Sequence, residues 1–105
     1  MINEVDANHL FESIRAWATV RGLDKTDSHA QMTKLTEELG EVANALIKKK
    51  PKDLEDGIGD AVVVLTILAL QNGLRIEDCV ATAMNEIKDR KGKLVNGTFV
   101  KETDL

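Results

Sequence analysis

Residues 54–71 run for roughly eighteen positions without a turn signal. Between Ala61 and Leu70 every residue except Thr66 is apolar, a pattern that indicates an element buried on all sides. The valines alone would also suit a strand, but strands usually run about 4–8 residues, so the length favours a helix. A helix buried on every side in a chain of 105 residues needs neighbours from a second subunit, so we expect an oligomer.

Three further helices are predicted, because apolar residues recur at helical spacing before and after this stretch. We expect the first over residues 6–22, capped by Asp6, and the second from His29 to about Lys49, capped by Asp27 or Ser28. Pro51 should break the chain, so the helix that contains the apolar stretch is expected to open near Asp53. A fourth helix follows Asn72-Gly73, and its expected inner face consists of Ile76, Val80, Ala83, Met84 and Ile87.

After Gly92 the pattern changes to two short extended runs on either side of Asn96-Gly97, a dipeptide typical of a type I′ hairpin turn. A lone hairpin is marginally stable in water, so we expect it to pack on the helices or on a neighbouring subunit. The sequence therefore predicts a single domain over residues 1–105. Its expected fold is all-α and four-helix bundle-like, with a short C-terminal β-hairpin.

Composition argues against several functional classes. Charged residues make up 30% and hydrophobic residues 43% of the chain, as in soluble globular proteins. A net charge of -4 gives no electrostatic footprint for duplex nucleic acid or an anionic membrane. The single Cys79 suits a reducing compartment, and the first ten residues lack the pattern of a leader, so we expect a cytoplasmic protein without a membrane partner.

Residues 34–46 predict a helix with acids placed beside its apolar stripe rather than opposite it. Glu38 borders the stripe, Glu41 lies one turn along, and Glu37 lies further out. Two carboxylates three positions apart can converge on one small cation, so their place at the rim of a core indicates a site. The stripe itself consists of Leu35, Leu39, Val42 and Leu46.

Three acids share one face at the start of the next helix: Asp53, Asp56 and Asp60. If the two helices are antiparallel, Glu41 lies at the level of Asp60 and Glu38 about one turn deeper. Carboxylates that close repel unless a cation lies between them, and oxygen ligands select Mg²⁺ or Mn²⁺ over zinc. The spacing alone equally allows a solvated acidic face, since charged residues are usually exposed.

Two further features each allow two interpretations. Trp17 suits core packing, or it offers a flat face on which a nucleobase can stack. The basic run near the end of the fourth helix suits solvated charge that complements the helix dipole, or it binds the phosphates of a polyphosphate ligand. This run consists of Lys88, Arg90, Lys91 and Lys93, with Asn85 one turn before it.

Taken together, these motifs resemble the all-α nucleotide pyrophosphohydrolases of the MazG-like superfamily. The family signature is Glu-Glu-x-x-Glu on one helix and Glu-x-x-Asp on the next. The first half is intact as Glu37, Glu38 and Glu41, and the second half appears at residues 57–60 as Gly-Ile-Gly-Asp. The resemblance extends from about Leu10 to Lys101. Similarity to short phage and integron-borne members also lies in Trp17-Ala18, Arg21-Gly22-Leu23 and residues 85–93.

The resemblance implies hydrolysis of a (deoxy)nucleoside triphosphate to the monophosphate and pyrophosphate, by a homodimer or homotetramer that cleans nucleotide pools. Carried over by position, Glu38, Glu41 and Asp60 would ligate Mg²⁺, with Mn²⁺ as a second candidate. The catalytic pair would be Glu37 and Glu38, with Glu37 orienting or deprotonating the attacking water. Lys88, Arg90 and Lys93 would hold phosphate, Asn85 would bond base or sugar, and Trp17 would stack on the base. The substrate-binding set is therefore Trp17, Lys34, Asn85, Lys88, Arg90 and Lys93.

Gly57 departs from the family pattern, because it stands where the family has a metal-ligating glutamate. Asp56 or Asp53 is a possible substitute, acting through a water; otherwise the activity is attenuated. Two other functions compete with the enzyme. One is a nucleotide-binding protein without turnover, and the other is a helical oligomerisation module whose acids are merely solvated.

Overall fold

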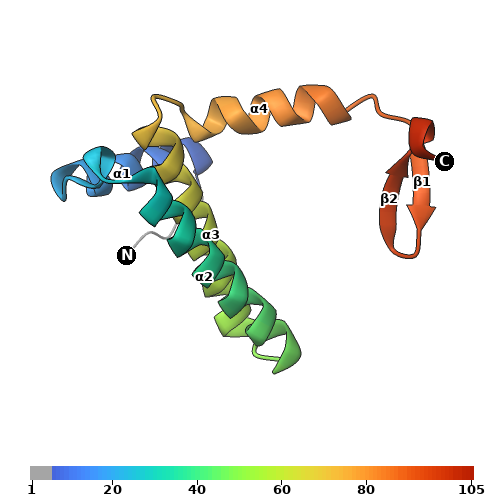
Figure 1. Ribbon diagram of the computed structural model, residues 1–105, viewed down its shortest axis with the longest axis horizontal. Coiled ribbons are helices and arrows are strands. Elements are labelled where there is room, and N and C mark those ends of the chain that lie inside the picture. Colours follow the sequence, from blue (N-terminus) through green and yellow to red (C-terminus); the bar gives the residue numbers. More distant parts are fainter. Residues whose placement is uncertain (1–5) are drawn as a thin grey trace.

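The computed structural model describes residues 6–105, so the first five residues of the polar N-terminal stretch lie outside the described part. The described chain is mostly helical and ends in an antiparallel hairpin, as Figure 1 shows, which confirms the predicted all-α character. In chain order the elements are α1 (Ala7–Val20), the 3₁₀ turn η1 (Leu23–Lys25), α2 (Ser28–Ile47), α3 (Pro51–Gln71), α4 (Ile76–Ile87), β1 (Gly92–Val95), β2 (Thr98–Lys101) and the 3₁₀ turn η2 (Glu102–Asp104).

The starts of the first three helices follow from capping chemistry. The Asp6 carboxylate accepts hydrogen bonds from the backbone N–H groups of Asn8 and His9, and that of Asp27 accepts one from His29, so both predicted caps are confirmed. The third helix begins at Pro51, two residues before the predicted start. Proline suits this first position, because its fixed φ is helical and no N–H is needed there.

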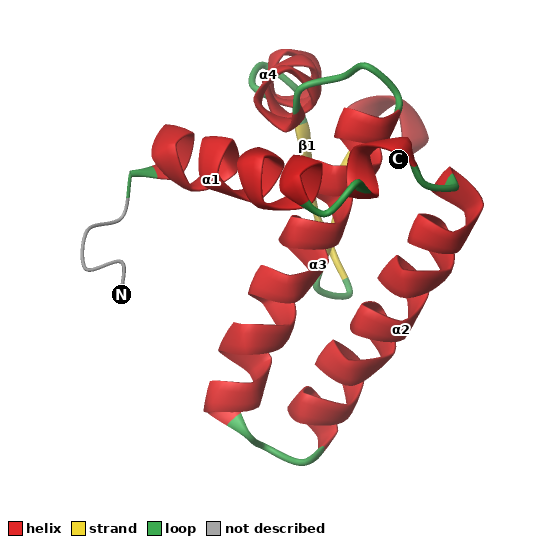
Figure 2. Ribbon diagram, turned by 90° about the vertical axis from the view of Figure 1, so that its left-hand side faces the viewer, coloured by secondary structure: helices red, strands yellow, loops and turns green. Residues whose placement is uncertain are grey.

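α2 and α3 form an antiparallel hairpin, visible side by side in Figure 2, and this pair is the main packing unit. Leu35 of α2 packs with Ala61 and Val64 of α3 in a buried cluster. The two helices also approach closely at Gly57, where an added β-carbon would lie 3.1 Å from Cγ2 of Val42. The predicted antiparallel pairing of these two helices is thereby confirmed. The pairing fixes which residues of α2 face which residues of α3.

α1 crosses α3 near the C-terminal end of that helix, and the loop behind it is held by polar contacts (Figure 2). Ala18 of α1 is completely buried. The side-chain amide of Gln71 donates to the Leu23 carbonyl and to the Thr26 hydroxyl, both at 2.9 Å. These bonds tie the end of α3 to the turn between α1 and α2, which sets the position of α1 relative to the hairpin.

α4 and the β-hairpin extend away from the other helices as an arm, residues 76–104, which Figure 1 shows plainly. None of the residues of α4 is buried, and its expected inner face is open within the chain: Val80, Met84 and Ile87 are each about half exposed. The expectation of a four-helix bundle is therefore not met by one chain. Amphipathic spacing specifies a face to be covered, but it does not specify which copy of the chain covers it.

Two other expectations involve a second subunit, and a single chain does not test them. The long apolar helix is not buried on all sides within one chain, because Val62 and Leu65 of α3 remain more than a third exposed. The hairpin forms as predicted, with Asn96 and Gly97 at positive φ in the turn. Within residues 6–105 it extends away from the helices (Figure 1), so the predicted packing on a neighbouring subunit stays a prediction. No single helix in the described range is long and apolar enough to cross a membrane; α3 and α4 pass that test only jointly, as a pair bent by 103°.

The base of the arm is tied to α1 by a two-pronged ion pair. Arg15 donates from Nη1 and Nη2 to the two carboxylate oxygens of Glu77, at 2.6 and 2.7 Å. Arg75 adds a contact of 3.0 Å to the same carboxylate. The hydrogen bonds from Arg15 lower the pKa of Glu77 from 4.5 to about 2. This pair fixes where the arm leaves the helical body.

We expect this ion pair to make stability depend on acid pH. Because the folded-state pKa of Glu77 lies below 4.5, its contribution is complete above about pH 4.5 and is lost as pH falls towards about 2. Glu77→Gln should therefore lower Tm near neutral pH, and its difference from the wild type should shrink through that window. Thermal melts followed by circular dichroism measure this, with Glu86→Gln on the exposed side of α4 as the control. A Tm difference that stays constant with pH would contradict the prediction.

Candidate functional site

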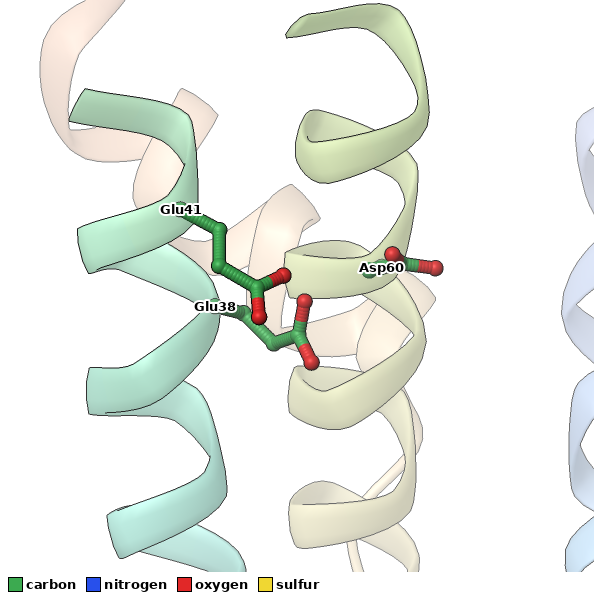
Figure 3. Close-up of side chains that lie close together, drawn as sticks. All are labelled: Glu38, Glu41 and Asp60. Atoms are coloured by element: carbon green, nitrogen blue, oxygen red, sulfur yellow. The ribbon is translucent and has the colours of Figure 1, made fainter. Parts of the chain in front are cut away.

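Three carboxylates meet between α2 and α3. One oxygen each of Glu38, Glu41 and Asp60 lies within 4.8 Å of the others. Figure 3 shows Glu38 and Glu41 extending from α2 towards α3, the helix that carries Asp60. The first two share a face because they are three residues apart on one helix, and the antiparallel hairpin brings the third to their level. The spacing of the acids predicts that carboxylates of α2 and α3 meet, and the cluster consists of the three residues that the family resemblance implies as metal ligands.

Glu38 is the most constrained member of this carboxylate cluster. It is only 6% exposed, and one of its oxygens, Oε1, lies 3.3 Å from Nζ of Lys34. The other oxygen, Oε2, is buried and has no hydrogen-bond partner among residues 6–105. A buried charged oxygen without a partner is costly, and a divalent cation between three carboxylates would satisfy it. The residues present therefore fit a Mg²⁺ or Mn²⁺ ion.

The surroundings of the cluster also disfavour full ionisation of its carboxyl groups. The charge of Glu38 is the main cause that raises the pKa of Glu41. Burial, followed by the charge of Asp56, raises the pKa of Asp60. The contact with Glu38 also raises the pKa of Lys34, which for a lysine favours the charged form. The shifts of Glu41 and Lys34 report an excess of negative charge, which is the electrostatic condition that favours binding of a cation, whereas the shift of Asp60 is caused mainly by burial.

The remaining predicted acids lie around this cluster. Asp56 and Asp60 line the same shallow hollow on α3, and the charge of Asp56 is one of the causes that raise the pKa of Asp60. Asp53 lies with Asp56 and Glu41 in a second hollow of about 250 Å³ between α2 and α3. Glu37 is exposed beside the cluster and is not one of its three members. Gly57 is buried against Val42, so position 57 faces α2.

Trp17 lies closer to the acids than its sequence position suggests. It is 48% exposed and lines an open, mostly apolar hollow of about 420 Å³ that also contains Asp60. The other lining residues are Leu10, Ser13, Ile14 and Val63. The guanidinium of Arg21 lies 4.1 Å from the centre of the Trp17 ring. Sequence reasoning assigned no role to Arg21, although its spacing four residues after Trp17 on a helix is the signal that would have shown this contact.

The basic residues are placed elsewhere. Asn85, Lys88, Arg90 and Lys93 belong to the arm, and Figure 1 shows the far end of the arm well separated from α2 and the first half of α3. The structure therefore does not bring these four residues to the carboxylate cluster of the same chain. Of the predicted substrate-binding set, only Lys34 and Trp17 lie beside the acids.

Comparison with known protein families shows to which family the chain belongs. The model of the MazG nucleotide pyrophosphohydrolase domain matches residues 26–95, which is more than half of the chain. The chain belongs to the MazG family. The MazG match includes α2, α3 and α4, and therefore all three members of the carboxylate cluster. It begins after α1, so Trp17 and Arg21 lie outside it.

A viral relative supports the assignment. An uncharacterized 18.2 kDa protein in the rep-hol intergenic region of Haemophilus phage HP1 (strain HP1c1) is 41% identical over 68 residues, which are 64% of this chain and 42% of that protein. The chain thus spans less than half the length of this relative. No solved structure matches the chain. Membership of the MazG family implies nucleotide pyrophosphohydrolase activity in general, and the carboxylate cluster accords with the metal dependence that is usual in this family.

Proposed function

We propose that the protein is a Mg²⁺-dependent pyrophosphohydrolase that converts (deoxy)nucleoside triphosphates to the monophosphate and pyrophosphate, in cytoplasmic nucleotide pools. The observation that carries the proposal is Oε2 of Glu38, a buried carboxylate oxygen without a hydrogen-bond partner among the described residues, in a cluster whose three oxygens lie within 4.8 Å of one another. Glu38, Glu41 and Asp60 hold Mg²⁺ or Mn²⁺ in this proposal. A merely solvated acidic face would not bury one of its carboxylates.

The neighbouring residues take the other roles. Bound Mg²⁺ supplies charge neutralisation of the triphosphate and activation of water for in-line attack on the α-phosphorus. Glu37, exposed beside Glu38, orients or deprotonates that water. Asp56, next to Asp60, takes over through a water the ligand position that Gly57 leaves empty. Trp17 stacks on the nucleobase, since its hollow contains Asp60 and would direct the phosphates towards the cluster.

The phosphate-binding residues of the arm come, in this proposal, from a second copy in a homodimer or homotetramer. Within one chain, the far end of the arm lies well away from the part of α2 and α3 that carries the carboxylate cluster (Figure 1). The arm exposes an apolar stripe, Val80, Met84 and Ile87, and α3 exposes Val62 and Leu65. Packing one face against the other across two copies would cover both and bring Lys88, Arg90, Lys93 and Asn85 to the partner's carboxylates.

Mixing two inactive variants tests this arrangement. We expect Glu38→Gln and the double variant Lys88→Ala/Arg90→Ala each to be inactive alone. Refolded together in equal amounts, they should regain about a quarter of wild-type activity, because half of the random dimers are mixed and each of those holds one intact site. Pyrophosphate release measures the recovery, with each variant mixed with itself as the control. A mixture that remains inactive would show that acids and cations act within one chain.

The reaction itself is tested by product analysis. The wild-type protein with Mg²⁺ is incubated with a panel of ribo- and deoxynucleoside triphosphates, and pyrophosphate and orthophosphate are measured separately. We expect pyrophosphate and the monophosphate, and no turnover with excess EDTA. Release of orthophosphate and a nucleoside diphosphate would show cleavage between the β- and γ-phosphates and would contradict the proposal. Mg²⁺-dependent nucleotide binding without turnover would favour a binding protein instead, and neither binding nor turnover would favour an oligomerisation module.

A further inference from the structure

Lys34 is the one cationic side chain that forms an ion pair with the carboxylate cluster within the part of the chain that the structure describes. It lies one helical turn before Glu38 on α2, and its Nζ is 3.3 Å from Glu38 Oε1. The two partners differ sharply in burial, because the lysine side chain is 54% exposed and the glutamate side chain 7%. The ammonium therefore reaches from solvent to the rim of the cluster.

A single ammonium is an incomplete counter-ion for this cluster. It contacts one oxygen of Glu38, and the other oxygen, Oε2, has no hydrogen-bond partner from Asp6 onwards. A divalent cation bound by the same carboxylate would repel the ammonium, since like charges at about 4 Å repel appreciably even near a protein surface. The flexible and half-exposed lysine side chain can move away at little cost. A triphosphate beside the cluster would offer the displaced ammonium new oxygen acceptors.

We propose that Lys34 exchanges partners during the catalytic cycle: it neutralises Glu38 in the metal-free protein and binds a phosphate oxygen of the nucleotide once the carboxylates hold their metal. The inference rests on the proposed function of this site. The exchange of partners makes the binding of metal and of nucleotide cooperative. Lys34 competes with the metal for Glu38 until a triphosphate attracts the lysine away from the carboxylate. Lys34 is thus a positioning residue in the empty site and a substrate ligand in the loaded one.

Lys34→Met separates these two roles, because it keeps an unbranched side chain that is one atom shorter and removes the charge. Without nucleotide, calorimetry should show that the variant binds Mn²⁺ at least about threefold more tightly than the wild type, as a competing cation is lost. With Mn²⁺ present, the α,β-methylene analogues of the four common deoxynucleoside triphosphates should bind roughly tenfold more weakly, as a charged hydrogen bond is lost. A merely structural role would not move the two affinities in opposite directions.

Thermal melts add a readout that is independent of turnover. Metal-free Lys34→Met should have a lower Tm than the wild type, because repulsion within the cluster is no longer offset, and saturating Mn²⁺ should close the gap. Lys34→Arg should behave like the wild type, and so should Lys48→Met at the end of the same helix. Unchanged or weaker Mn²⁺ binding by Lys34→Met, or unchanged nucleotide binding, would overturn the exchange while leaving the metal centre intact. A wild-type protein that binds no Mn²⁺ would overturn both the partner exchange of Lys34 and the proposed metal centre.

Discussion

Glu38→Gln is expected to lower the rate of triphosphate hydrolysis by more than about a hundredfold. Loss of a residue that only supports a metal ligand commonly costs about 10–100-fold, so loss of a direct ligand should cost at least that. The neutral amide keeps the shape of the side chain, but it lacks the negative charge with which a carboxylate oxygen binds Mg²⁺. Pyrophosphate release with Mg²⁺ and the preferred nucleotide measures the loss, and Mn²⁺ calorimetry should show weaker binding in parallel.

The same substitution should leave the metal-free protein as stable as the wild type, or more stable by about 1 kcal/mol, because the cluster then carries one charge fewer. The pKa of Glu41, which the charge of Glu38 raises, should fall towards its ordinary value. Urea unfolding in EDTA measures the free energy of unfolding, with Glu86→Gln as the control. Full activity of Glu38→Gln would contradict its role as a ligand, whereas lost activity with a large loss of stability would indicate a folding defect.

Local chemistry explains why most of the fold was predictable. Asp6 and Asp27 cap helices because a short acidic side chain can reach the free N–H groups of the first turn. The hairpin turn follows from Asn96-Gly97, a pair that tolerates positive φ at both positions. The carboxylate cluster was predictable for a related reason, since helical spacing and an antiparallel turn fix which residues of two helices share a level.

The placement of α4 was not predictable in the same way. Its apolar residues at helical spacing require a partner surface, but the pattern is identical whether that surface belongs to the same chain or to a second copy. The structure leaves Val80, Met84 and Ile87 about half exposed, so the other described residues of the chain do not cover this face. The contact between Trp17 and the hollow of Asp60 was hidden for another reason: it joins two helices whose crossing depends on tertiary packing rather than on local signals.

The second large effect is expected at Gly57. Restoring the family's glutamate there, together with Val42→Ala, should raise turnover about tenfold or more if the missing ligand limits the reaction. The second substitution is needed because an added β-carbon at position 57 would lie 3.1 Å from Cγ2 of Val42. Gly57→Glu alone should therefore gain helix propensity of about 1 kcal/mol but lose about 1–3 kcal/mol to overpacking, which masks any gain in activity through partial unfolding.

The control for this experiment is Gly57→Ala/Val42→Ala, which has the same packing change without the carboxylate. Turnover that rises only in the glutamate variant shows that Gly57 leaves a defect in the metal site. Equal turnover in both variants shows instead that Asp56 already supplies the ligand, and then Asp56→Asn in the wild type should reduce turnover by about tenfold or more. Asp56 and position 57 both line the hollow beside Glu41, and Asp56 also lines the hollow of Asp60, so the paired variants are needed to show which carboxylate serves the metal.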